Sequence, residues 1–306
     1  MKKRRIRNMA LFAVLVFIIL IGTAGALLAR DRAMILIHPA RSSITIRPDD
    51  VGLASYEDVT FTTVDGVEIA AWYIAPPVER GAALIYAHGL GHNREFMLDQ
   101  AALLYQHGYG ALLIDFRNHG ESGGDMTTLG FYEPYDIQAG IDFLLERPEV
   151  NPEQIGVVGQ SLGAVTAIRA AAVMPELRAA VVQSTFTSIE ENVAAGVRQI
   201  TGLPPFPFAP LVIYFGQQET GLSIEQVRPI DDIAQIAPRA VLLMHGQQDH
   251  LISPDNSQRL YDAAGEPKEL VYFPNAAHGG LLASDPELWE TSITSFLDRY
   301  LRGVES

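Results

Sequence analysis

One short stretch of this chain, residues 155–163, constrains its fold more than any other. It reads Ile-Gly-Val-Val-Gly-Gln-Ser-Leu-Gly, and helix-forming residues follow at 164–172. A β-branched run, a turn flanked by glycines and a helix, in this order, place Ser161 on a strained turn with its hydroxyl projecting from a sheet. The helix that follows directs its N-terminal amides at negative charge developing beside the serine. We therefore predict that Ser161 is a nucleophile.

Strand-like and helix-like segments alternate from residue 82 onward. This alternation predicts an α/β fold with a mostly parallel central sheet and helices on both faces. A hairpin precedes it, because residues 56–63 and 67–75 alternate around Asp65-Gly66. In sheets of this kind the chemistry collects at the carboxyl ends of the strands. The later segments are predicted strands at 82–87, 111–115, 155–158, 179–183, 240–245 and 269–273, and predicted helices at 95–106, 132–146, 164–172, 254–264 and 286–301.

The N-terminal 30 residues predict a membrane anchor. Five basic residues lie among the first seven positions, and residues 8–29, 22 positions in all, contain no charged side chain. Such a stretch is long enough to cross a bilayer as one transmembrane helix, and the basic cluster predicts that everything after Arg30 lies on the outer side. A signal peptide cleaved near Ala24-Gly25-Ala26, which would leave a secreted protein, is the alternative. The apolar stretch runs past that point to Leu28, which favours the retained anchor.

Composition restricts the partners of the remaining chain. The formal net charge is −14, and the residues after the first seven hold 17 basic and 36 acidic side chains. A body this acidic repels phosphate backbones, so we expect no nucleic-acid partner. The chain has no cysteine, which excludes disulfides and thiolate metal sites. We predict no metal and no cofactor, and the sequence predicts no oligomeric state.

Residues 187–237 interrupt the alternation. Residues 188–191, Ser-Ile-Glu-Glu, form a capping-box pattern that starts a helix ending near Gly202. Four prolines between 204 and 210 then predict irregular structure. We interpret the insertion as a cap over the serine. Four of its aromatic side chains either line an acyl pocket or form the cap's own core: Phe206, Phe208, Tyr214 and Phe215.

Activation of the serine needs a base and an acid. An imidazole must take the hydroxyl proton, and a carboxylate must orient that imidazole. Two histidine-bearing turns, residues 245–250 and 275–280, follow predicted strands downstream of the serine. We predict Asp249 as the acid and His278 as the base. His245 and His250 compete as the base, but both lie too near Asp249 in sequence to reach the serine from a separate loop.

Acyl transfer also needs two backbone donors for the developing oxyanion. Leu162, directly after the serine, supplies one predicted donor. The turn at residues 88–92 follows the first central strand, and we predict that the amide of Leu90 is the other. The side chains of His88 and His92 are expected to be hydrogen-bonded parts of this turn rather than catalytic groups.

Four ordered signatures make the chain resemble the α/β-hydrolase superfamily of serine hydrolases. They are His-Gly-Leu-Gly at 88–91, Asp-Phe-Arg-Asn-His-Gly-Glu-Ser at 115–122, Gly-Gln-Ser-Leu-Gly at 159–163, and the pair Asp249 with His278. The segments 56–61, 65–66 and 71–73 further resemble the membrane-anchored subgroup with a single N-terminal helix. The resemblance implies that residues 115–122 are structural and shape a loop near the site. One departure is Ala277, where the family usually has a glycine before the histidine.

Together these features predict an anchor at 1–30, a linker at 31–55 and an α/β-hydrolase domain at 56–306 with the cap at about 187–237. We predict a serine hydrolase that cleaves a small-molecule or lipid acyl ester through an acyl-enzyme. A peptidase is one alternative, since some members of the superfamily bind a free amine through cap carboxylates, here Glu190 or Glu191. A hydrolase-fold protein that only binds a partner is another.

Overall fold

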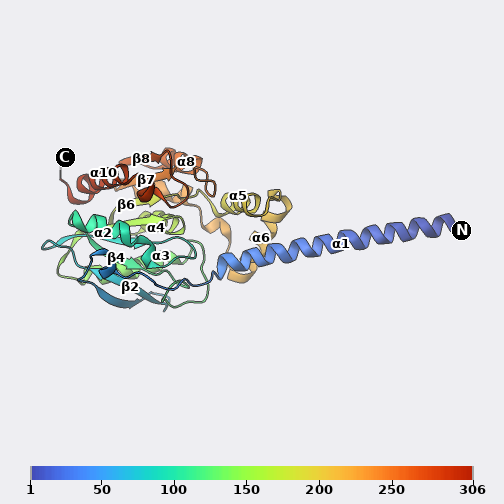
Figure 1. Ribbon diagram of the computed structural model, residues 1–306, viewed down its shortest axis with the longest axis horizontal. Helices are drawn as coiled ribbons and strands as arrows, with labels where there is room; N and C mark the ends of the chain where they lie inside the picture. The colour runs from blue at the N-terminus through green and yellow to red at the C-terminus, as the bar shows by residue number, and fades with distance from the viewer. Residues whose placement is uncertain (1, 305–306) are drawn as a thin grey trace.

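The centre of the computed structural model, which describes residues 2–304, is an eight-stranded sheet between two helical layers (Figure 1). The strand order is β1-β2-β4-β3-β5-β6-β7-β8. The first two strands form the predicted hairpin, and β2 pairs antiparallel with both β1 and β4, whereas the other six strands are parallel to one another. The strands are β1 (Glu57–Thr62), β2 (Glu68–Ile74), β3 (Gly81–Ala87), β4 (Gly110–Ile114), β5 (Val150–Gln160), β6 (Leu177–Gln183), β7 (Ala240–Gly246) and β8 (Lys268–Phe273).

Strand β3, at the centre of the sheet, is buried along its whole length because both faces of the sheet are covered. In β3, Leu84 and Tyr86 pack into the core on one side, and Ala83 and Ile85 pack into the core on the other. Helices α3, α4 and α8 cover one face, and α2 and α10 cover the opposite face. The bounds are α2 (Leu98–Gln106), α3 (Glu133–Leu145), α4 (Leu162–Val173), α7 (Pro229–Asp232), α8 (Asp255–Ala263), α9 (Leu281–Ser284) and α10 (Pro286–Leu297). Short 3₁₀ segments are η1 (Pro48–Val51), η2 (Arg94–Met97), η3 (Ile224–Gln226) and η4 (Ile233–Ile236), and a π-helical turn, η5, spans Asp298–Arg302.

The N-terminal helix, α1 (Lys2–Ile37), extends far out of the domain (Figure 1). Its segment Arg4–Ile37 is long and apolar enough to span a membrane. The helix continues beyond the expected boundary at residue 30, so the first seven residues of the predicted linker are helical. The reason is tertiary: Ala29 and Ala33 are buried in a core shared with the cap. This packing stabilises the last two turns of the helix.

The insertion between β6 and β7 contains two long helices, α5 (Ile189–Thr201) and α6 (Pro205–Thr220), followed by the short helix α7. As predicted, Ser188 caps α5, accepting a hydrogen bond from the amide of Glu191 at 3.3 Å, and Gly202 ends it. The prediction of irregular structure at residues 204–210 is wrong for most of this stretch, which is helical. Within α6, only Phe206 has non-helical φ and ψ angles. Prolines are tolerated near the start of a helix because the amide hydrogen that they lack would have no intrahelical acceptor there.

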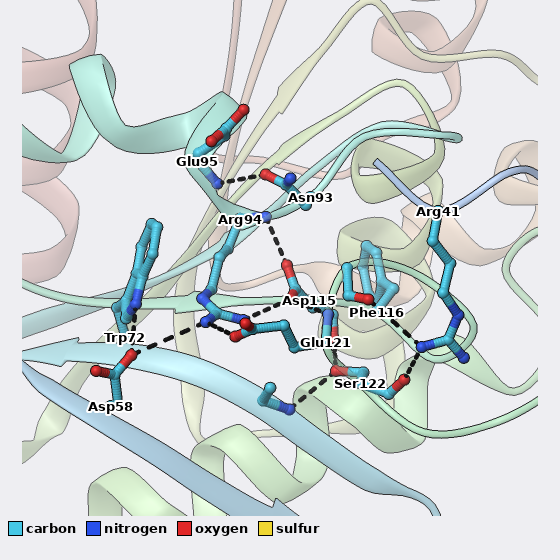
Figure 2. A network of polar contacts seen from close by, with 12 residues as sticks. Arg41, Asp58, Trp72, Asn93, Arg94, Glu95, Asp115, Phe116, Glu121 and Ser122 are labelled. Atoms are coloured by element: carbon cyan, nitrogen blue, oxygen red, sulfur yellow. Dashed lines mark hydrogen bonds and ion pairs between the residues drawn. The ribbon is translucent and has the colours of Figure 1, made fainter. Parts of the chain in front are cut away.

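Residues 115–122 form a loop that a buried network holds in place (Figure 2). The Asp115 carboxylate is fully buried and accepts hydrogen bonds from the amide and the guanidinium of Arg94 at 2.6 and 2.5 Å. Ser122 Oγ donates to the Asp115 carbonyl at 2.6 Å and accepts from the amide of Ala70 at 2.9 Å. Arg41, from the segment after α1, donates to the Ser122 carbonyl at 2.5 Å. These contacts tie the loop to the sheet and to the segment that follows α1.

Candidate active site

Ser161 lies at the turn between β5 and α4 in a strained conformation, with φ 54° and ψ −114°. A non-glycine residue with positive φ needs support from its surroundings. Two glycines provide the space: a Cβ on Gly159 would overlap the carbonyl of Gly163, and a Cβ on Gly163 would overlap the carbonyl of Ala87. Backbone segments therefore pass where side chains would otherwise lie, and the serine hydroxyl projects from the carboxyl edge of the sheet.

The structure brings Ser161, His278 and Asp249 into one chain of hydrogen bonds. Ser161 Oγ lies 3.1 Å from His278 Nε2, and His278 Nδ1 lies 2.7 Å from Asp249 Oδ2. His278 is on the loop after β8, whose backbone turns at Gly279 with φ +83°. Ala277 stands where the family usually has a glycine, yet His278 lies within hydrogen-bond distance of Ser161. The residue on the other side of the histidine, Gly279, takes the left-handed conformation.

The carboxylate of Asp249 is buried but has several hydrogen-bond donors. Oδ1 accepts from the amides of Leu251 and Ile252 at 2.9 and 2.8 Å. Burial by itself raises the pKa of Asp249, but hydrogen bonds from His245 and His278, the charge of His278 and the Ile252 amide outweigh burial and hold the pKa well below its usual range. The aspartate is therefore ionised and can stabilise a protonated His278.

His245 contacts Asp249, the predicted acid, rather than Ser161. It is fully buried, and its Nε2 lies 3.2 Å from Asp249 Oδ2 and 3.0 Å from the Ile252 carbonyl. Because a carbonyl only accepts, we assign the proton to Nε2, and Nδ1 then accepts from Ser257 Oγ at 2.6 Å. Of the two competing bases, His245 thus contacts the predicted acid, and His250 is exposed at the surface. Sequence spacing did not indicate this second histidine contact.

The predicted oxyanion donors flank the serine. Leu90 and Leu162 both line the pocket into which Ser161 and His278 open. Leu162 is the first residue of α4, where amides have no intrahelical acceptor. Within residues 2–304, the amide of Leu90 donates to no protein acceptor. Both positions therefore suit donors to a developing oxyanion.

His88 and His92 differ in their surroundings. His88 is fully buried, donates from Nδ1 to the Gly89 carbonyl at 2.8 Å and accepts at Nε2 from the amide of Phe116 at 3.1 Å. Burial and the neighbouring His119 lower the pKa of His88 well below its usual value, so it is a neutral structural group. His92 stacks on Phe96, with ring centroids 4.0 Å apart, and lines the pocket.

The pocket beside the serine has a volume of about 620 Å³. Its walls come from the loops at the sheet edge, from α5 and α6, and from the C-terminal end of α1. Glu190 and Glu191 do not line it, and Glu191 pairs with Arg259 at 2.5 Å. Of the four cap aromatics, Phe208 and Phe215 pack against the cap core, whereas Phe206 and Tyr214 are exposed.

Across the described part of the chain, no group of three or more histidine, aspartate or glutamate side chains is arranged to hold a metal ion.

Some known proteins resemble this chain in sequence, and some solved structures resemble it in fold. The chain is 29% identical to the uncharacterized protein YqkD of Bacillus subtilis, over 76% of each chain. It is 30% identical to the uncharacterized protein Rv2307c of Mycobacterium tuberculosis, over 77% of this chain and 75% of that one. Among solved structures, the Pyrococcus furiosus esterase Pf2001 matches with a TM-score of 0.74 and 28% identity, over 87% of this chain and 98% of the esterase.

A family model places the chain more firmly. The model of the prolyl oligopeptidase family matches residues 94–304, which include every residue of the hydrogen-bonded chain from Asp249 to Ser161. This protein is thus a hydrolase of the α/β-hydrolase type and belongs to the prolyl oligopeptidase family.

Proposed function

We propose that the protein is a membrane-anchored serine hydrolase that cleaves carboxylic esters with an apolar acyl group. The hydrogen-bonded chain from Asp249 through His278 to Ser161, at the floor of a largely apolar pocket, carries this proposal. The esterase Pf2001, similar over nearly its whole length, supports it.

The proposed reaction has two halves. In the first, His278 Nε2 takes the proton of Ser161 Oγ as that oxygen attacks the acyl carbonyl carbon. The amides of Leu90 and Leu162 stabilise the oxyanion, and Asp249 stabilises the protonated imidazole. The intermediate then collapses, the ester oxygen leaves with the proton from His278, and an acyl-serine remains. In the second half, water attacks the acyl-serine by the same route and releases the carboxylic acid.

The pocket favours an ester over a peptide with a free amino terminus. An aminopeptidase needs a carboxylate near the bound amine, but the two candidate cap carboxylates lie outside the pocket. Glu191 is engaged by Arg259 and by Thr187 Oγ1. An apolar acyl chain, by contrast, finds Val193, Val197 and Val212 in the walls.

The test is labelling of the purified full chain with a fluorophosphonate, followed by hydrolysis of p-nitrophenyl esters of increasing acyl length. We expect wild-type protein to be labelled, and Ser161→Ala to lose the label and about 10⁴-fold or more of its activity. The exposed Ser43→Ala variant serves as the control and should keep both. Turnover of amino-acyl amides in preference to esters would favour the peptidase. A folded wild-type chain that takes no label would favour a binding protein.

A further inference from the structure

The membrane-spanning helix forms part of the candidate active site. Arg32, Ile35 and Leu36, from the last two turns of α1, line the same pocket as Ser161 and His278. The preceding turns pack along α6, where Ala29 is buried and a Cβ on Gly25 would lie 3.2 Å from the Phe208 ring. Helix α1 runs from the pocket past the cap helices and out of the domain (Figure 1), so a bilayer that holds α1 lies beside the cap.

The rim of the pocket is apolar and open. Ile35, Ile200 and Leu251 line the pocket and are also exposed. Water-exposed side chains of this size are ordinary when isolated, but a group of them around a pocket marks a contact surface. These three come from α1, from α5 and from the loop after β7, so they surround the opening rather than lie along one element.

The tip of the cap, residues 200–208, is also suited to contact with lipid. Residues 200–218 contain no charged side chain, and Phe206, at the start of α6, is 78% exposed. Neither the pocket nor the cap core includes Phe206. An uncharged, proline-rich segment with an exposed aromatic ring is better suited to contact with lipid than with water.

The depth of the cap tip follows from its contact with α1. Gly25, which packs on Phe208, precedes Ala29, the last residue of the uncharged stretch, by four positions. At 1.5 Å per residue this is about 6 Å inside the apolar segment. Elements that lie in a membrane interface bury their apolar side to about 5–10 Å. The start of α6 thus lies at the depth at which such elements meet the acyl chains.

We propose that the cap tip, residues 200–208, inserts into the leaflet on the domain's side of the membrane, and that the pocket admits the acyl chain of a lipid ester directly from that leaflet. This inference rests on the proposed function for its substrate, whereas the insertion itself does not need catalysis. Arg32, one turn beyond the apolar segment, is then placed at the level of the lipid headgroups.

The insertion is tested by fluorescence on the full chain, which has no native cysteine. Phe206→Cys carries an environment-sensitive label in phosphatidylcholine vesicles that contain nitroxide lipids. The control is Val173→Cys at the far end of α4, where Val173 is 68% exposed. We expect nitroxide lipids to quench the label at position 206 and aqueous iodide to quench it at position 173. Quenching at 206 by iodide alone would overturn the proposal, and so would protection from both quenchers, which would mean that a second copy covers the tip.

The route of the substrate is tested by activity. Phe206→Asp should lower hydrolysis of a long-chain ester embedded in vesicles by about tenfold or more, because a charge is costly at membrane depth. Turnover of the water-soluble p-nitrophenyl butyrate should stay unchanged, since Phe206 lies outside the pocket. Val173→Asp should change neither rate. An equal loss on both esters, or no loss on either, contradicts entry from the leaflet. Fluorophosphonate labelling of Ser161 in the same vesicles reports separately on the proposed function.

Discussion

Ser161 holds its strained backbone because neighbouring residues leave space for it. Gly163 is the most sensitive of these, since a Cβ there would overlap a backbone carbonyl that belongs to β3 and cannot move aside. We expect Gly163→Ala to prevent formation of the turn and to lower the melting temperature strongly. Gly196→Ala is the matched control, because a Cβ at that helical position meets nothing within 4 Å. This control should be neutral or stabilising by about 0.5–1 kcal/mol. Equal melting temperatures for the two variants would contradict the steric argument.

Asp249 also affects stability through its protonation. Its pKa is lower in the folded protein than in the unfolded chain, where a carboxyl titrates near 3.9. The folded state therefore binds fewer protons, so Asp249 stabilises the fold above about pH 4, and this contribution is lost as the pH falls toward the folded pKa. We expect the melting temperature of the wild type to fall more between pH 6 and pH 3 than that of Asp249→Asn. Parallel curves for the two proteins would show that the aspartate is not linked to folding.

Individual site residues could be predicted from the sequence where the chemistry restricts the residue type. The glycine–serine turn and the order of serine, acid and histidine indicated three side chains that the structure places in contact. The contact of His245 with Asp249 could not be predicted from spacing. It depends on how the turn after β7 folds back, so that residues 245 and 249 meet while residue 250 points outward.

Among the elements, α1 and α6 depend on each other. Small residues on one face of α1 allow close approach, as at many helix interfaces in membranes. Ala29→Leu should overpack this contact and destabilise the chain by about 1–3 kcal/mol, seen as a lower melting temperature in detergent. Ala24→Leu adds the same atoms at an exposed position of the same helix and should have little effect. A similar loss in both variants would mean that the bulk of the residue, rather than its position, is responsible.

Helices and strands were predicted correctly where their own sequence pattern identifies them. They were missed where packing against distant residues determines the structure. The parallel strands were recognisable from their apolar runs, since both faces are buried. The extension of α1 to Ile37 was not, because its last turns are stabilised by the cap, which lies some 170 residues further along the chain. Helix α6 was missed for a related reason: prolines near its start suggested an irregular segment, although the first turn of a helix tolerates them.

For the whole molecule, we predict that the N-terminal helix is retained. The small residues Ala24-Gly25-Ala26 suit a signal-peptidase site, but Gly25 and Ala26 are half-buried, and Gly25 faces Phe208. Their size is therefore explained by helix packing. In cells that express the protein with a C-terminal tag, we expect the membrane fraction to hold the full-length chain after a carbonate wash. A soluble product whose N-terminus follows Ala26 would show that the helix is a cleaved signal.

The sequence predicts the side of the membrane on which the domain lies. The basic residues that precede the apolar segment of α1 favour a cytoplasmic N-terminus, and so an external domain. A membrane-impermeant maleimide should label Val173→Cys in intact cells, because this position is exposed and distant from the cap. Labelling that appears only after the cells are opened would reverse the orientation.

The direct passage of α1 into the cap limits the reach of the enzyme. A hydrolase on a long tether can rotate and attack a neighbouring vesicle or a dissolved ester, whereas a domain anchored as proposed is held at a fixed angle to its own bilayer. If its opening faces that bilayer, it works only in cis. Its rate then follows the mole fraction of substrate within one leaflet, and dilution of the surrounding medium leaves it unchanged.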